Sequence, residues 1–249
     1  MNRVDYDDVA PVYDRRYETN RFDGTHRALI EFLGDRRDLD VVEIGCGTGH
    51  WLAALAGRAQ TVIGIDPSDR MLAGARSAAP HAFVLRGLAE HVPLRSESVD
   101  RVFAINALHH FADKVVFMAE ARRVLRPGGA LMTIQLDPHT GRDQWWVYDY
   151  FPATLVADRA RYPATATLRE AMARSGFRDA TTSVAQHIPA AVPFAVALER
   201  GILDRRATSQ LMVISDADYE TGRRRLEQEQ PALRADLRLY MTAARVPDR

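Results

Sequence analysis

The sequence predicts an α/β fold whose centre is a parallel β-sheet. Between Asp40 and Asp137, short apolar runs of strand length alternate with longer amphipathic runs of helix length. A helix between two strands returns the chain to the same edge of the sheet, so the two strands run parallel. Because helices then cover both faces of the sheet, we expect a doubly wound architecture.

The alternating region divides into strands and helices at recognisable signals. The expected strands are Asp40–Gly45, Thr61–Asp66, Ala82–Gly87, Val99–Asn106 and Gly128–Leu136. The expected helices are His50–Gly57, Ser68–Ala79 and Asp113–Leu125. Ser68 is placed to cap the second helix. Pro127 stops the third, because proline lacks the N–H group that a helix interior needs.

Further elements flank this region on both sides. The expected helices are Tyr6–Tyr17, Thr25–Gly34, Thr165–Phe177 and most of Pro189–Gln230, with Ser215 as a cap. The expected strands are Asp179–Ile188 and Leu237–Val246. The sheet then has seven strands. We expect the last one to be antiparallel, because the Pro189–Gln230 connection is long enough to reverse the chain.

Composition excludes several classes of protein. The 249 residues contain 33 Lys and Arg against 33 Asp and Glu, so nothing favours nucleic acid as a partner. The N-terminus lacks the layout of a signal peptide, and no apolar run reaches membrane-spanning length. The single cysteine suits a reducing compartment. We therefore expect a cytoplasmic protein that binds neither nucleic acid nor membrane, and the oligomeric state stays open.

Three glycines mark the candidate ligand site. Gly45, Gly47 and Gly49 alternate with other residues where the first core strand turns into a helix. This point lies outside the carboxyl end of a parallel strand, where open α/β sheets bind ligands. A tight turn alone also explains glycines here. Asp66 ends the next strand, however, and a carboxylate beside the loop can accept both hydroxyls of a ribose. The pattern therefore favours an adenosine-type ligand.

Four motifs together resemble the class I S-adenosylmethionine-dependent methyltransferases. They are E-x-G-x-G-x-G from Glu43, "VIGIDPS" from Val62, "VPLRSESVDRVFAINALHHFAD" from Val92 and "EARRVLRPGGALMTI" from Glu120. They occur in family order over 41–134 and are most similar to ubiquinone/menaquinone-type and natural-product small-molecule methyltransferases. The resemblance implies a Rossmann-like fold, an S-adenosyl-L-methionine cofactor that becomes S-adenosyl-L-homocysteine, and no metal.

The resemblance also assigns the cofactor site. It implies that Asp66 holds the ribose hydroxyls and that the Asn106 carbonyl receives the methionine ammonium. Glu43 is expected to face the loop and accept hydrogen bonds. The implied cofactor-binding residues are Tyr13, Glu43, Gly45, Cys46, Gly47, Gly49, Asp66, Pro67, Leu88, Ala89 and Asn106.

One position departs from the family pattern. Relatives often have Gly-Asp-Ala after the third strand, and its acid accepts from the adenine amino group. This chain has Gly87, Leu88 and Ala89 there. Leu88 can pack on the ring but cannot accept a hydrogen bond, so backbone atoms of Leu88 or Ala89 are the alternative.

The division of the chain follows from the motifs. We expect one domain, in which residues 1–137 hold the N-terminal cap helices and the cofactor-binding core. Residues 138–164 are an aromatic cap insertion, and 165–188 return to the core as a helix and a strand. Residues 189–232 are a helical cap insertion, and 233–249 supply the last strand.

Two kinds of reactive side chain accompany the motifs. Cys46 is either a thiolate activated at a helix N-terminus or, as we favour, a small residue tolerated in a tight loop. His109 has a suitable pKa for a general base and is our catalytic candidate. His110 points in another direction on a helix, so the two histidines are not expected to share a metal. In relatives with diverse substrates, "LHH" is a fold element.

The aromatic residues predict a substrate cover. Tyr6, Tyr13 and Tyr17 lie on one helix face, either as core packing or as a lid over the cofactor. The block "WWVYDYFP" either packs on the sheet or covers an apolar pocket. An anionic anchor at Arg161 predicts an aromatic or lipophilic acid as the acceptor. The expected substrate-binding residues are Tyr17, His110, Trp146, Tyr148, Tyr150, Phe151 and Arg161.

The predicted reaction is transfer of a sulfonium methyl group by in-line displacement to a small-molecule or natural-product acceptor. Alignment of the reactants supplies roughly 7–11 kcal/mol of the barrier reduction. The accepting atom is O, N or C. Methylation of a peptide carboxylate is an alternative. Two further alternatives are a cyclase or pericyclase that keeps the cofactor and a binding module without activity. Intact glycines and Asp66 argue against the last of these.

Overall fold

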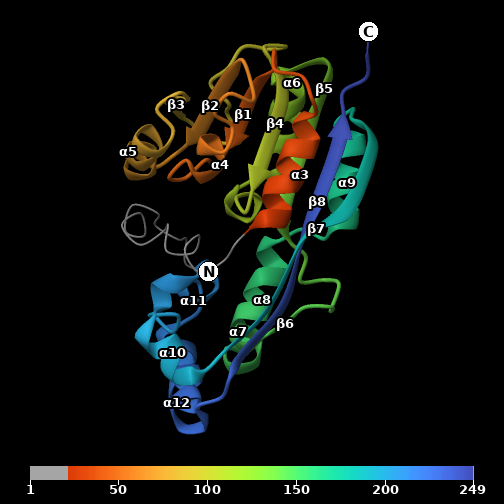
Figure 1. The fold of residues 1–249 in the computed structure, drawn as a ribbon. Helices are drawn as coiled ribbons and strands as arrows, with labels where there is room; N and C mark the ends of the chain where they lie inside the picture. Colours follow the sequence, from red (N-terminus) through yellow and green to blue (C-terminus); the bar gives the residue numbers. More distant parts are fainter. Residues whose placement is uncertain (1–21, 249) are drawn as a thin grey trace.

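The structure is a computed structural model that describes residues 22–248. Its centre is an eight-stranded sheet in the order β3-β2-β1-β4-β5-β8-β6, with β7 paired to β8 (Figure 1). The first five strands are parallel, and β8 is antiparallel to β5, β6 and β7. The strands are β1 (Asp40–Ile44), β2 (Thr61–Asp66), β3 (Phe83–Arg86), β4 (Val99–Ile105), β5 (Leu125–Leu136), β6 (Gln144–Trp145), β7 (Arg178–Val192) and β8 (Leu233–Arg245).

The doubly wound sheet and its antiparallel last strand are confirmed. The sheet has one strand more than expected, because Gln144 and Trp145 pair with β8 as the short strand β6. The helix expected over Tyr6–Tyr17, with the site residues Tyr13 and Tyr17, lies outside the described residues.

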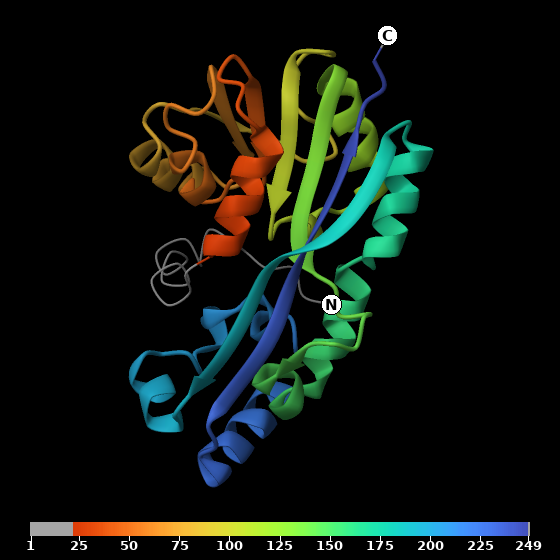
Figure 2. The same ribbon diagram turned by 45° about the vertical axis from the view of Figure 1, so that its right-hand side comes forward.

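Helices cover both faces of the sheet, and each face has its own apolar core (Figure 2). One core joins the sheet to α3 (Asp23–Leu33), α4 (His50–Ala53) and α5 (Asp69–Ala78). The other joins it to α6 (Lys114–Val124) and α9 (Thr165–Arg174). The α4 helix ends four residues before Gly57, where we placed its end, and continues as turns. Ser68 caps α5 as predicted, since its side chain accepts from the Met71 amide.

Strands β7 and β8 are longer than the sheet that they complete. Their pairing runs from Arg178 opposite Arg245 to Val192 opposite Leu233. Strand β5 leaves β8 at Leu239, so the remaining residues of β7 and β8 continue past the sheet as a two-stranded ribbon, clear in Figure 1. We predicted that β7 ends at Ile188, before Pro189. Proline is tolerated in this strand because β7 is an edge strand. It pairs only with β8, so a residue on its outer side can lack an N–H group without losing a hydrogen bond of the sheet.

The ribbon leads into a helical cap below the carboxyl ends of the parallel strands (Figure 1). Both insertions contribute to it, and together they bury a third apolar core. Within it, the Phe151 ring stacks on Tyr219 with centroids 5.8 Å apart. The cap helices are α7 (Trp146–Tyr150), α8 (Pro152–Arg161), α10 (Phe194–Glu199), the 3-10 helix η3 (Arg205–Ala207), α11 (Ser209–Met212) and α12 (Asp216–Glu229).

Gly222 on α12 packs closely against the first insertion. A Cβ atom at this position would run into the Phe151 ring and lie 2.5 Å from the Tyr150 carbonyl oxygen. We expect Gly222→Ala to destabilise the protein by about 1–3 kcal/mol, because the added methyl group overpacks the cap core. Urea denaturation measures this. Glu220→Ala, an exposed change on the same helix, is the control and should stay within about 0.5 kcal/mol of wild type. Equal stability of the two variants would contradict the packing described.

Candidate functional site

The glycine loop after β1 has the backbone that only glycine adopts freely. Gly45 and Gly49 have φ angles of +76° and +84°. A Cβ atom on Gly45 would lie 2.5 Å from the Cβ of Ala107, the second residue after β4. The loop therefore touches the end of β4, and both open at the same edge of the sheet.

Asp66 ties this loop to the end of β2. Its Oδ2 accepts from the Gly47 amide at 3.0 Å, and its Oδ1 accepts from the Ser68 amide at 2.9 Å. The expectation that this carboxylate lies beside the glycines is confirmed. Its side chain is almost buried, with 8% of the residue exposed. Backbone donors on both oxygens stabilise the charged form.

Glu43 is a second carboxyl group behind the same loop. It is buried, and its Oε2 has no hydrogen-bond partner in the described structure. Burial raises the pKa of Glu43 well above its usual value, and the neighbouring charge of Asp66 raises the pKa further. An acceptor without a donor is costly in the interior, so Glu43 offers a fixed position for a donor that comes from a ligand.

Cys46 fits the structural role that we favoured. The thiol is buried, and its burial, together with Glu43 and Asp66, raises the pKa of the Cys46 thiol. A thiolate is therefore disfavoured at this position, which argues against activation for nucleophilic attack.

The end of β4 faces a cavity. Asn106 has a φ angle of +52° and donates its amide to the Ile134 carbonyl of β5. Beyond it, the His109 ring stacks on Tyr162, with centroids 4.1 Å apart and planes 17° apart. Asn106, His109, His110 and Tyr162 all line the cavity. A strained non-glycine backbone at such an edge is typical of a functional position.

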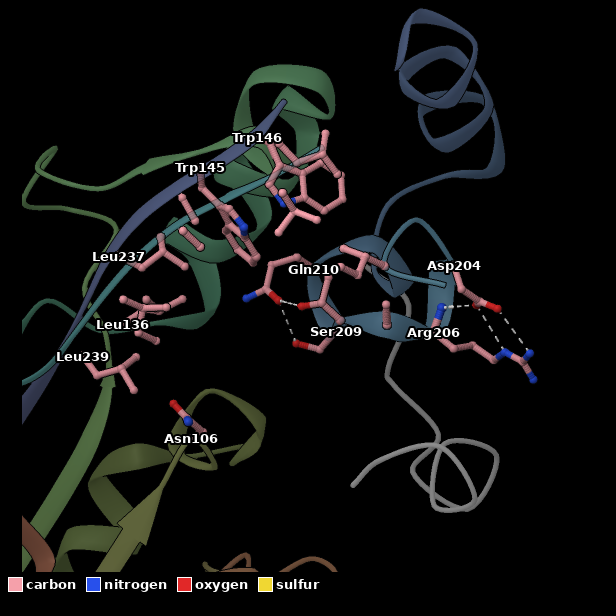
Figure 3. Close-up of a pocket in the computed structure, with 18 of the residues that line it drawn as sticks. Asn106, Leu136, Trp145, Trp146, Asp204, Arg206, Ser209, Gln210, Leu237 and Leu239 are labelled. Atoms are coloured by element: carbon pink, nitrogen blue, oxygen red, sulfur yellow. Dashed lines mark hydrogen bonds and ion pairs between the residues drawn. The ribbon is translucent and has the colours of Figure 1, made fainter. Parts of the chain in front are cut away.

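The cavity has a volume of about 400 Å³, the size of a small-molecule site. Its walls include the ends of β4 and β5, one face of the β7–β8 ribbon, aromatic residues of the first insertion, and the cap segment from Arg200 to Gln210. In Figure 3, Leu136, Leu237 and Leu239 lie on one side of the open space, and Ser209 and Gln210 face them from α11. Asn106 lies where the cavity meets the parallel sheet.

Comparison with known proteins agrees with the motifs. The family model described as a methyltransferase domain matches residues 42–133. Residues 42–133 are therefore a methyltransferase domain. The fold of the YcgJ protein from Bacillus subtilis superposes with a TM-score of 0.64 and 19% identity, covering 90% of this chain and 99% of that one.

Two curated relatives match the methyltransferase domain in sequence. A probable S-adenosylmethionine-dependent methyltransferase of Mycolicibacterium smegmatis is 34% identical over 116 residues, which are 46% of this chain and 45% of that protein. The demethylmenaquinone methyltransferase of Lactiplantibacillus plantarum is 34% identical over 146 residues, 52% of this chain and 60% of that protein. The chain thus spans about half the length of the curated relatives it matches.

The residues expected to contact adenine differ in exposure. Leu88 is 48% exposed, whereas Ala89 is buried. Pro67 follows Asp66, and its carbonyl accepts from the Arg86 side chain at 3.2 Å. Leu88 is therefore not part of the core, and its expected contact with adenine stays a prediction.

The substrate residues divide into two groups. Trp146 and His110 line the cavity, whereas Tyr148 and Arg161 do not. Both of the latter bind the buried Asp158: the Tyr148 hydroxyl donates to it at 2.8 Å and Arg161 Nη2 at 2.5 Å. Arg161 uses Nη2 for this pair, whereas its buried Nε and Nη1 have no hydrogen-bond partner among the described residues, so its role as an anchor for an anionic substrate stays a prediction.

Tyr150 and Phe151 also lie away from the cavity lining. The Tyr150 hydroxyl donates to Glu229 Oε2 at 2.6 Å, and Phe151 packs in the cap core. Their expected place in the pocket wall is corrected: they join the two insertions. Tyr150 and Phe151 of the aromatic block therefore have the packing role that we gave as the alternative.

Sequence reasoning missed several lining residues. Trp145, Tyr162 and Gln210 line the cavity but were not among the expected substrate-binding residues. The apolar face of the ribbon was missed altogether. Its signal was present as alternation along β8, where Leu233, Ala235, Leu237 and Leu239 are separated by polar residues.

No group of three or more His, Cys, Asp or Glu residues within 22–248 is arranged to hold a metal ion. Over the same residues, no helix is both long and apolar enough to cross a membrane.

Leu88→Asp tests the adenine side of the domain. We expect the variant to fold, because the side chain is half exposed, and to bind S-adenosylhomocysteine several-fold more tightly. The gain comes from a carboxylate that accepts from the adenine amino group. Calorimetry measures the affinity, and Val156→Asp, an exposed position on α8, is the control. A Leu88→Asp variant that fails to fold, or that binds like the control, would show that adenine lies elsewhere.

Glu43→Gln tests the buried carboxyl group through pH. The native state holds the Glu43 proton more tightly than the unfolded chain, in which its pKa is near 4.5. Above that pH the unfolded state ionises first, so the free energy of unfolding of the wild type falls as pH rises. We expect Glu43→Gln to gain stability relative to wild type as the pH rises above about 4.5, as measured by urea denaturation. A difference that stays constant over this range would contradict the assignment.

Proposed function

We propose that the protein transfers the methyl group of S-adenosylmethionine to a small-molecule or natural-product acceptor held in the cavity. The observation that carries this proposal is the position of the β4 end. Ala107 packs against Gly45 of the glycine loop, and Asn106, immediately before it, lines the cavity. A donor on the loop would therefore meet an acceptor in the cavity at Asn106.

The residues around the loop suit the donor's polar groups. Asp66 is fixed beside the glycine loop by two backbone amides, where a carboxylate suits the ribose hydroxyls. Glu43 supplies a further acceptor behind the loop, and the Asn106 carbonyl suits the methionine ammonium. The glycines allow close approach of the cofactor, and Pro67, Leu88 and Ala89 border the adenine.

When bound, S-adenosylmethionine supplies an electrophilic methyl group. The part of the protein is then to align the acceptor and to exclude water, and alignment alone is worth roughly 7–11 kcal/mol. An acceptor that arrives protonated must release a proton. His109, held by stacking on Tyr162 at the cavity wall, is placed to accept it. The single cysteine suits the reducing cytoplasm, where we place the protein.

Asp66→Ala tests the donor site. We expect S-adenosylhomocysteine to bind more weakly by about 1.5–3 kcal/mol, the range for hydrogen bonds to a charged group. Calorimetry measures the loss, and Asp35→Ala, an exposed acid, is the control and should bind as wild type does. Thermal unfolding shows that both variants are folded. Equal affinity of the two variants would exclude the proposed donor site.

A further inference from the structure

The β7–β8 ribbon presents one continuous apolar face to the cavity. Ile188, Ala190 and Val192 line the cavity from β7. They alternate along the strand, so their side chains share one face. From the first half of β8, the alternating residues Leu233, Ala235, Leu237 and Leu239 also line the cavity. We call this face the ribbon floor.

The register joins the two rows into pairs. Ile188 lies opposite Leu237, Ala190 opposite Ala235, and Val192 opposite Leu233. The alanine pair leaves a depression between two bulkier pairs, because its side chains are the smallest of the floor. Directly opposed side chains are about 4.5–5.5 Å apart, so the floor is two side chains wide.

The other face of the ribbon is polar. On that face His187 lies opposite Arg238, and both side chains contact the carboxylate of Asp236, at 2.6 Å from His187 Nε2 and 3.1 Å from Arg238 Nη1. The apolar character thus belongs to the side that faces the cavity, and it is not a general property of the ribbon.

The floor is long and narrow. Six residue steps from Leu233 to Leu239 correspond to roughly 20 Å of extended chain. Trp145 and Trp146 border it, as Figure 3 shows, and Asn106 lies near the end at Leu239. The proposed methyl transfer takes place at this end.

The far end of the floor carries a positive charge. Strand β7 ends at Val192, and α10 begins two residues later and ends next to Arg200, which lines the cavity. Arg200 has no ion pair or side-chain hydrogen bond within the described part of the chain. Arg206, the other arginine of the lining, is held by Asp204. Arg200 is therefore available to an anion.

We propose that the acceptor is an elongated amphiphile, with an apolar chain on the ribbon floor and an anionic group at Arg200. Its methyl-accepting atom lies at the opposite end, beside Asn106. This inference rests on the proposed function for the direction of the molecule. The binding of an anionic chain to the floor is a separate property and is measured separately.

Alkyl probes test the floor by calorimetry, below their micelle concentrations and with saturating S-adenosylhomocysteine. The probes are octanoate, dodecanoate and dodecanol. We expect dodecanoate to bind more tightly than octanoate, by about fourfold for each added methylene group, because each one is buried on the floor. We expect dodecanol to bind more weakly than dodecanoate, because it cannot pair with Arg200.

Two pairs of variants locate the binding. Arg200→Gln should weaken dodecanoate about three- to tenfold and leave dodecanol unchanged, as expected for a partly exposed ion pair. Arg224→Gln, an exposed change on α12, should alter neither. Ala235→Trp fills the depression and should abolish binding of both probes. Ala191→Trp, on the polar face of the ribbon, should not.

The outcomes separate this inference from the proposed function. No chain-length dependence, or equal binding of dodecanoate by Ala235→Trp and Ala191→Trp, would overturn the inference even if S-adenosylhomocysteine binds normally. Equal loss of both probes in Arg200→Gln would overturn the anionic end. Chain-dependent binding that Ala235→Trp removes would support the floor even in a protein that does not bind S-adenosylhomocysteine, in which case the proposed function alone fails.

Discussion

The pairing of β7 with β8 is the constraint on which both halves of the molecule depend. Within the sheet, β8 also pairs with β5, but β5 leaves it at Leu239. Beyond that point only the two residues of β6 pair with its other side. Backbone N–H and C=O groups require partners wherever water is excluded, so each strand of the ribbon supplies those of the other. Without this pairing, neither the cap nor the cavity has a fixed position relative to the glycine loop.

The cap stabilises the ribbon in return. Its helices come from two insertions on either side of β7, and their shared core includes Leu233 at the start of β8. Contacts such as Tyr150 with Glu229 and Phe151 with Tyr219 join the insertions directly. Aromatic residues that looked like substrate contacts are therefore used to hold the cap together. Of the aromatic residues in the first insertion, Trp145, Trp146 and Tyr162 line the cavity.

The sequence predicted the half of the site that depends on local backbone chemistry. Glycines with positive φ and an acid at the end of the next strand occupy fixed positions in a βα unit, and the structure places them together. The ribbon was not predicted, because Pro189 is the usual signal for the end of a strand. Only the edge position of β7, a property of the whole sheet, makes proline acceptable there.

Arg161 shows a second limit of sequence reasoning. In a sequence, an arginine near aromatic residues is equally consistent with an anion-binding site and with a buried ion pair. Asp158, three residues earlier on the same helix, is fully buried and pairs with Arg161 Nη2, a contact that the sequence did not indicate. Arg200 belongs to no sequence motif. It became a candidate anion-binding residue only because the structure places it in the lining of the cavity, shortly after the end of β7.

A crystal structure with bound S-adenosylhomocysteine tests the central claim, that donor and acceptor meet at the end of β4. We predict that the ribose lies on Asp66 and that the sulfur lies beside Asn106, facing the cavity along the ribbon. A sulfur that faces away from the cavity, toward β3, would contradict the account, because nothing held on the ribbon could then receive the methyl group.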